Sequence, residues 1–178
     1  MPGILFVCTG NTCRSSMAAA IASHLKEERR LDIPVASAGL AAWEGAPATP
    51  EAIQAVAEMG IDLRDHRARQ VTADLVAGAD LVLTMTGAHR ERLRELYPEA
   101  GAKIFTLKEY VRDRQAALPA GEGRVEDGTG NAAGRPAGAH DDDIPDPIGR
   151  PLAVYQDTAR QLADLVGQAL EKFGQQNK

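Results

Sequence analysis

A Cys-x5-Arg loop between an apolar run and an Ala-rich stretch constrains the fold more than any other feature of this chain. It reads Cys8-Thr9-Gly10-Asn11-Thr12-Cys13-Arg14-Ser15 and follows the apolar residues 4–7. A loop of this length can curl so that successive N–H groups point inward, in front of a helix N-terminus. An oxyanion such as phosphate fits there. The sequence therefore predicts a strand, an anion-binding loop and a helix in direct succession.

Cys8 and Arg14 are suited to phosphoryl transfer. The positive end of the following helix favours the thiolate form of Cys8, which can attack phosphorus. The planar guanidinium of Arg14 can bind two phosphate oxygens at once. The alternative is a buried structural cysteine with an arginine nearby by chance, and the strand, loop and helix context argues against it. The loop thus indicates a cysteine phosphatase.

Length, charge and cysteine content fit one small domain in a reducing compartment. The chain has 178 residues, of which 44% are hydrophobic, and this is enough for one core. The net charge of −5 argues against a duplex nucleic-acid binder, which would be basic. The two cysteines lie in the loop and cannot form a disulfide framework or a four-thiolate zinc site. No cationic leader or long apolar run is apparent, so we expect a cytoplasmic protein without membrane attachment, metal or cofactor.

Short apolar runs alternate with amphipathic segments along most of the chain. The expected strands cover residues 4–8, 35–38, 80–85 and 103–106. The expected helices cover residues 16–28, 49–60, 87–97 and 155–173. This alternation is the signature of a parallel sheet with crossover helices, so the sequence predicts an α/β fold in a single domain over residues 1–178.

Residues 113–143 break this pattern. They are rich in Gly, Ala, Pro and charge, and they contain almost no large apolar side chain to bury. We therefore interpret them as a flexible loop insertion within the single domain.

The acidic run at the end of this segment offers a general acid. Release of a leaving group from phosphorus needs a proton, and a carboxylic acid above the pocket can supply it. Asp146 is the candidate, because Pro147 restricts it to extended geometry at a loop edge. The competing aspartates Asp141, Asp142 and Asp143 are interpreted as a solvated acidic run. A metal site is the other interpretation, but no second ligand cluster supports it.

Several other polar or aromatic residues have expected roles. Asn11 lies mid-loop, where a non-glycine residue with positive φ is most often asparagine. Ser15 is either a helix cap or a hydrogen-bond donor to the sulfur. By default, Ser37 and His66 are surface or capping groups. Trp43 fits a pocket wall or the core.

Nearly all of the chain outside the insertion resembles the low-molecular-weight protein phosphatase family. The resemblance rests on the loop at residues 8–15, on Ser37-Ala38-Gly39 after the second strand, and on Asp146-Pro147 late in the chain. This order, with the nucleophile first and the acid last, is specific. The resemblance implies a doubly wound four-stranded parallel sheet in the order 2-1-3-4, flanked by helices, with the loop at the topological switch point.

The resemblance also implies roles for individual residues. Cys8 would form a phosphocysteine, Arg14 would bind the phosphoryl group, and Asp146 would protonate the leaving group and later activate water. The substrate would be bound by Thr9, Gly10, Asn11, Thr12, Cys13, Ser15 and Trp43. Ser37 and His66 would join Asn11 in a hydrogen-bond network under the loop. The implied substrates are phosphorylated proteins, so the enzyme would counteract a protein kinase.

Two positions bear on the identity of the substrate. Tyrosine phosphatases of the family tend to carry a branched aliphatic residue where this chain has Thr12, whereas protein-arginine phosphatases of Gram-positive bacteria carry threonine. A hydroxyl at the pocket wall suits a polar guanidinium better than an aryl ring. Ile148 replaces an aromatic residue of tyrosine-directed members, and residues 105–110 look like the arginine-directed branch. We expect phosphoarginine as the substrate, with phosphotyrosine as the alternative.

Three functions of other kinds compete with hydrolysis. A thiol-coupled arsenate reductase shares this fold and a similar loop, but it relays electrons through further cysteines, and none follows Cys13. A phosphocarrier that accepts phosphate on a cysteine would not need the pair of Arg14 and Asp146. A binding module would not need every reactive position to be present.

Overall fold

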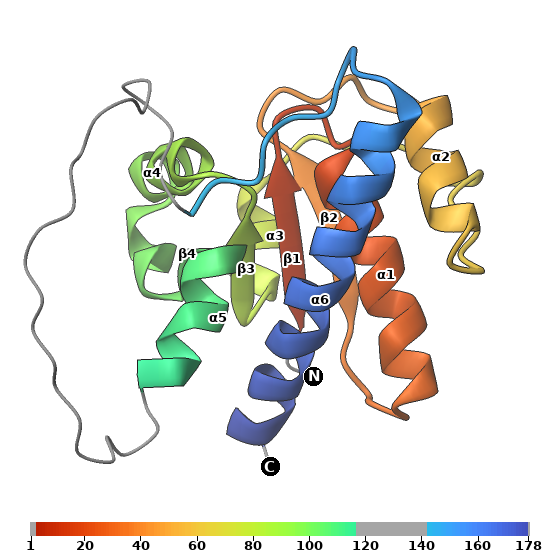
Figure 1. Cartoon of the computed structure of the whole chain (residues 1–178). Helices are drawn as coiled ribbons and strands as arrows, with labels where there is room; N and C mark the ends of the chain where they lie inside the picture. The colour runs from red at the N-terminus through yellow and green to blue at the C-terminus, as the bar shows by residue number, and fades with distance from the viewer. Residues whose placement is uncertain (1–2, 117–141, 178) are drawn as a thin grey trace, which may run out of the picture.

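A four-stranded parallel sheet runs through the centre of the computed structural model, which describes residues 3–116 and 142–177 (Figure 1). The strands are β1 (Ile4–Cys8), β2 (Val35–Gly39), β3 (Leu81–Thr84) and β4 (Ile104–Thr106). They lie in the order β2-β1-β3-β4, and all three neighbouring pairs are parallel. The predicted α/β class and the strand order 2-1-3-4 are confirmed.

Helices cover both faces of this sheet (Figure 1). One face packs against α1 (Arg14–Glu28), α2 (Pro50–Ala57), α5 (Leu107–Ala116) and α6 (Leu152–Gln176). The other face packs against α3 (Ala73–Gly78), α4 (Gly87–Leu96) and the short 3-10 helix η1 (Pro98–Lys103). Burial on both sides explains why β1 is a continuous apolar run in the sequence, with all five residues buried.

The terminal helix α6 supplies much of the core on the first face. Its buried side chains recur every three or four positions, and Tyr155, Leu162 and Phe173 are among them. Burial of one large apolar side chain stabilises a fold by about 1.5–3 kcal/mol. The α6 stripe packs against the α1, α2 and α5 residues of the same cluster, so it joins the two ends of the chain.

The sequence did not predict α3 or α5. Both are short, and each begins at a threonine whose hydroxyl accepts a hydrogen bond from the helix: Thr72 from Leu75 N–H and Thr106 from Glu109 N–H. The last residues of α5, 113–116, were assigned to the insertion and are helical. The rest of the predicted insertion, residues 117–141 with Asp141, lies outside the described residues.

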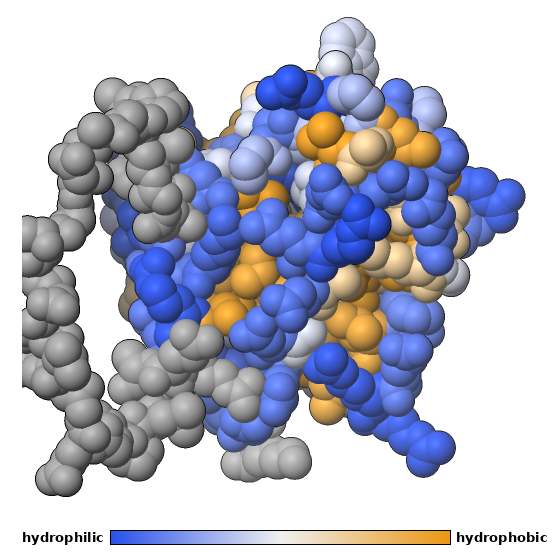
Figure 2. Space-filling model, in the orientation of Figure 1, coloured by the Kyte–Doolittle hydropathy of each residue, from blue (hydrophilic) through white to orange (hydrophobic). Residues whose placement is uncertain are grey.

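Hydrophilic side chains cover most of the face on which α6 lies, with apolar surface in narrow strips between them (Figure 2). Within residues 3–116 and 142–177, no helix combines the length and the apolar composition that a membrane-spanning segment needs.

Candidate active site

The loop of residues 8–15, here called the catalytic loop, begins where β1 ends. Neighbouring strands continue on either side of it, because Leu40 N–H after β2 bonds to Cys8 and Met85 N–H after β3 bonds to Val7. From β1 the chain crosses first to β2 on one side and later to β3 on the other. The loop therefore lies at the topological switch point, where open parallel sheets bind ligands.

The backbone of the catalytic loop is turned so that its carbonyl groups face outward. Outside donors bond to four carbonyls of the loop: Leu40 N–H to Cys8, Ala41 N–H to Thr9, His66 Nε2 to Asn11, and Thr49 N–H to Thr12. A carbonyl that points outward directs the next N–H inward. Among the described residues, the N–H groups of Gly10, Thr12 and Cys13 have no acceptor. The loop is thus a concave set of donors in front of α1, as an anion site requires.

Asn11 fixes the curvature of the loop. Its φ of +57° lies in the left-handed region, as the sequence predicted. Its side chain is fully buried and bonded at both ends, because Arg69 N–H donates to Oδ1 at 3.1 Å and Nδ2 donates to Ser15 at 2.9 Å. The Arg69 guanidinium also donates to the carbonyl of Ser37 at 2.9 Å. Asn11 therefore connects the loop to the segment after α2 and to β2.

The sulfur of Cys8 receives two hydrogen-bond donors. Asn11 N–H lies 3.3 Å from it and the Ser15 hydroxyl lies 2.9 Å from it. The Ser15 oxygen accepts from Asn11 Nδ2, and its hydrogen has two acceptors within reach, the sulfur at 2.9 Å and the carbonyl of Ala38 at 3.5 Å, of which the sulfur is the nearer. Ser15 makes no capping bond, because the N-cap position of α1 is Cys13. Of the two roles considered for Ser15, the structure shows the contact with sulfur.

Gly39 at the end of β2 lies against the catalytic loop. A Cβ atom on this residue would lie 2.5 Å from the carbonyl oxygen of Thr9 and 3.0 Å from the Asn11 nitrogen. Such contacts are too short for any side chain. Gly39 in the Ser37-Ala38-Gly39 motif therefore allows β2 to approach the loop closely. Ser37 lines a different pocket, which His66 also lines.

Arg14 joins the catalytic loop to residues 142–148, here called the acid segment. The guanidinium is buried, donates from Nη1 to the carbonyl of Ile144 at 3.0 Å, and lies 3.2 Å from the Asp146 carboxylate through Nη2. Its Nε is buried and has no partner among the described residues. The Asp146 side chain is 43% exposed, so it can meet a substrate and solvent.

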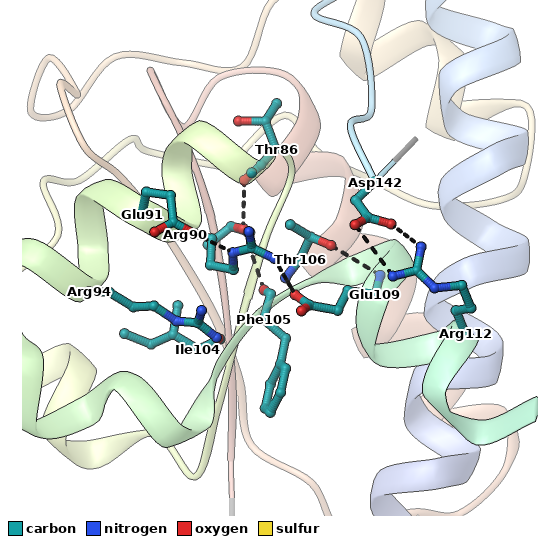
Figure 3. A network of polar contacts seen from close by, with 12 residues as sticks. Thr86, Arg90, Glu91, Arg94, Ile104, Phe105, Thr106, Glu109, Arg112 and Asp142 are labelled. Atoms are coloured by element: carbon teal, nitrogen blue, oxygen red, sulfur yellow. Dashed lines mark hydrogen bonds and ion pairs between the residues drawn. The ribbon is translucent and has the colours of Figure 1, made fainter. Parts of the chain in front are cut away.

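The acid segment is held from its other side by α4 and α5. Asp143 accepts from Gly87 N–H through its carboxylate and from Lys108 through its carbonyl, both at 2.8 Å. Asp142 forms an ion pair with Arg112 (Figure 3). Figure 3 also shows Arg90 of α4 bonded to Glu109 of α5, which links the two helices. The segment that carries the candidate acid is thus anchored mainly through Asp143 and through the backbone bond from Ile144 N–H to Met85.

The catalytic loop and the acid segment enclose a small pocket of about 120 Å³. Its lining residues are Cys8, Thr9, Gly10, Thr12, Cys13, Arg14, Asp146 and Ile148. Trp43 is 84% exposed on the loop after β2 and does not line this pocket. Sequence reasoning thus brought together the thiol, the guanidinium and the carboxylate, but its two alternatives for Trp43, pocket wall and core, do not describe where this side chain lies.

Two histidines touch the loop in uncharged form. Burial lowers the pKa of His66, which donates to the loop at 2.6 Å. Burial, and then the nearby Arg14 charge, lower the pKa of His89 to about 4. His89 Nε2 lies 2.8 Å from the Thr9 hydroxyl. No sequence pattern pointed to His89 or Arg69, because their contacts depend on how α4 and the segment after α2 pack. Within residues 3–116 and 142–177, the active site included, no group of His, Cys, Asp and Glu side chains could hold a metal ion.

Comparison with known proteins gives concordant matches. The family model described as low molecular weight phosphotyrosine protein phosphatase matches residues 3–121. The protein-arginine-phosphatase of Bacillus subtilis (strain 168) is 35% identical over 170 residues, which cover 96% of this chain and 95% of that protein.

Solved structures agree. A YwlE arginine phosphatase, a cysteine-to-serine mutant with a phosphorylated active-site serine, matches with a TM-score of 0.77 and 34% identity, covering 96% of this chain and 94% of that one. A low molecular weight protein tyrosine phosphatase from T. tengcongensis also has a TM-score of 0.77, with 40% identity, and the match covers 97% of this chain and 99% of that chain.

Proposed function

The chain belongs to the low molecular weight phosphotyrosine protein phosphatase family, and we propose that it hydrolyses phosphoarginine on proteins through a phosphocysteine on Cys8. One observation carries the chemistry: the sulfur of Cys8, with two donors bonded to it, lines the same pocket as Arg14 and Asp146. A nucleophile, an anion anchor and a proton donor therefore meet at one point.

The reaction proceeds in two displacements. The Cys8 thiolate attacks phosphorus while the bond from phosphorus to the guanidinium nitrogen breaks, and Asp146 gives its proton to that nitrogen. Arg14 and the inward N–H groups bind the three phosphoryl oxygens. In the second step Asp146 takes a proton from water, whose oxygen attacks phosphorus. Inorganic phosphate leaves, and the thiolate of Cys8 is restored.

Phosphoarginine is favoured over phosphotyrosine by the chemistry of the pocket wall. Thr12 is a polar residue of the pocket lining, with its hydroxyl 3.7 Å from Cys13 Sγ, and Ile148, which is 59% exposed, offers no ring for an aryl group to stack on. A polar wall binds a guanidinium, whose N–H groups need acceptors, better than an aromatic ring. A relative in Bacillus subtilis, a protein-arginine-phosphatase aligned over nearly the full chain, supports this choice.

The physiological setting follows from the same chemistry. The substrates are phosphorylated proteins, and the enzyme reverses the action of a protein kinase that phosphorylates arginine. Both cysteines are free and buried. A thiolate nucleophile is active only when reduced, so the cytoplasm is the compartment that suits it.

Phosphotyrosine is the second candidate substrate, because the T. tengcongensis relative is described as a tyrosine phosphatase at 40% identity. The test is a side-by-side measurement of kcat/KM on one peptide carrying phosphoarginine or phosphotyrosine, with Cys8→Ser as the control for contaminating activity. We expect at least about tenfold preference for phosphoarginine. A preference for phosphotyrosine would overturn the arginine assignment and leave the phosphatase assignment intact.

A further inference from the structure

His89 is a buried titratable side chain that touches the catalytic loop and has no role in the mechanism above. It lies on α4, is 8% exposed, and places Nε2 at 2.8 Å from the hydroxyl of Thr9. Thr9 follows the nucleophile and lines the pocket with Arg14. The ring of His89 therefore contacts a residue of the pocket wall.

The charge state of His89 limits what it can do. Burial and the neighbouring Arg14 lower its pKa to about 4, so the ring is neutral when the enzyme works near pH 7. A neutral imidazole has one N–H donor and one acceptor nitrogen. It cannot exchange a proton usefully near neutral pH, which leaves a hydrogen-bonding role.

The surroundings of the second ring nitrogen select one tautomer. Nδ1 is buried, and it has no hydrogen-bond partner among the described residues. A proton on Nδ1 would bury an N–H group without an acceptor, which is the rarer of the two kinds of unpaired group in folded proteins. With the proton on Nε2, the ring donates to the Thr9 oxygen. Thr9 then keeps its own hydrogen for another acceptor.

We propose that His89 is a positioning residue that holds the Thr9 hydroxyl as a further hydrogen-bond donor to the phosphoryl group. This inference rests on the proposed function, since it adds a side-chain donor to the inward N–H groups and Arg14. Among the described residues, Thr9 Oγ1 has no second partner, and Thr9 is one of the residues that line the pocket in which the phosphoryl oxygens would bind. A donor fixed before the substrate arrives needs no reorganisation during the reaction.

The test measures the competitive inhibition constant of inorganic phosphate, together with kcat and KM, in matched pairs of variants. Thr9→Val removes the hydroxyl and Thr9→Ser keeps it. His89→Leu removes the ring donor, and His89→Gln keeps an N–H donor near the position of Nε2. We expect about tenfold weaker phosphate inhibition in Thr9→Val and His89→Leu, and less than about threefold change in the conservative variants. Phosphate should inhibit the double variant Thr9→Val/His89→Leu no more weakly than it inhibits the more affected of the two single variants.

Several results would contradict the proposal. If Thr9→Val had the same inhibition constant as the wild type, the Thr9 hydroxyl would not be a donor to phosphate. If the effects of the two substitutions added up in the double variant, His89 would not act through Thr9. If His89→Gln lost as much as His89→Leu, the ring would act only by packing. Nitrogen NMR of the wild type tests the tautomer directly, and a proton on Nδ1 would overturn it. Inorganic phosphate has no leaving group, so these results do not depend on whether phosphoarginine is the substrate.

Discussion

The catalytic loop and the acid segment face each other across the pocket but are held in place differently. The loop is buried from Asn11 to Ser15 except for Thr12, and backbone bonds from β2, α2 and their connections hold its carbonyls. The acid segment has Pro145 and Asp146 exposed, and it is held by one backbone bond, from Ile144 N–H to Met85, and by the bonds of Gly87 N–H and Lys108 to Asp143. The backbone of the catalytic loop is therefore fixed on several sides, whereas Asp146, the proposed acid, lies on a more exposed segment.

This difference predicts that substitutions in the loop reduce activity severely, whereas the effect of a substitution in the acid segment depends on which carboxylate is replaced. Replacement of the nucleophile should have the largest effect. Cys8→Ser should reduce kcat by at least about 10⁴-fold, because serine is a poor nucleophile without an adjacent base.

Binding should survive this change, because the N–H groups and Arg14 remain. Calorimetric titration with inorganic phosphate would check it. Hydrolysis by Cys8→Ser above the level of a mock purification would argue against covalent catalysis.

Within the acid segment, the carboxylates should differ from one another. Asp146→Asn should lower kcat by about 10²- to 10⁴-fold, with a smaller loss on an aryl phosphate whose leaving group needs no proton. Asp142→Asn is the matched control. It breaks only an exposed ion pair with Arg112 and should change kcat little. Similar losses in both variants would show that Asp146 is not the acid.

The pocket wall offers a change of selectivity that leaves the loop backbone intact. Thr12→Ile should shift the ratio of kcat/KM toward phosphotyrosine by about 10²-fold, because the aliphatic side chain favours a ring and leaves guanidinium donors unpaired. The ratio is measured on the two substrates for wild type and variant. If the ratio of kcat/KM did not change, Thr12 would not determine the choice between the two substrates.

The backing of the loop by β2 should be sensitive to a single methyl group. Gly39→Ala should lower the free energy of unfolding by about 1–3 kcal/mol, because the new Cβ meets the Thr9 and Asn11 backbone. Gly78→Ala is the matched control, since a Cβ there meets nothing within 4 Å. Denaturant unfolding of both variants gives the comparison. Equal free energies of unfolding for the two variants would show that the loop can move to make room for the added methyl group.

Much of the fold and the centre of the site could be predicted from the sequence, because local patterns encode them. The apolar run of β1 and the loop after it placed Cys8 and Arg14 together, and the late Asp146-Pro147 pointed to the carboxylate that lies beside Arg14. Asn11 was expected at positive φ because few other residues adopt it.

The contacts that depend on tertiary packing could not be predicted in this way. His89 reaches Thr9 only because α4 begins shortly after β3, which pairs with β1, and Arg69 reaches Asn11 from a segment without regular structure. The start of α5 did carry a signal, since Thr106 and Glu109 bond to each other's N–H groups as a capping box. An interpretation based on the apolar pattern alone does not detect this helix start.

The most direct test of the phosphocysteine mechanism is to trap the intermediate. Asp146→Asn should slow hydrolysis of the phosphocysteine, so rapid mixing with a phosphoarginine peptide and acid quenching should accumulate it. Peptide mapping by mass spectrometry should then locate one phosphoryl group on Cys8. A phosphoryl group on another residue, or none while phosphate is released at the expected rate, would contradict the assignment of Cys8 as the nucleophile.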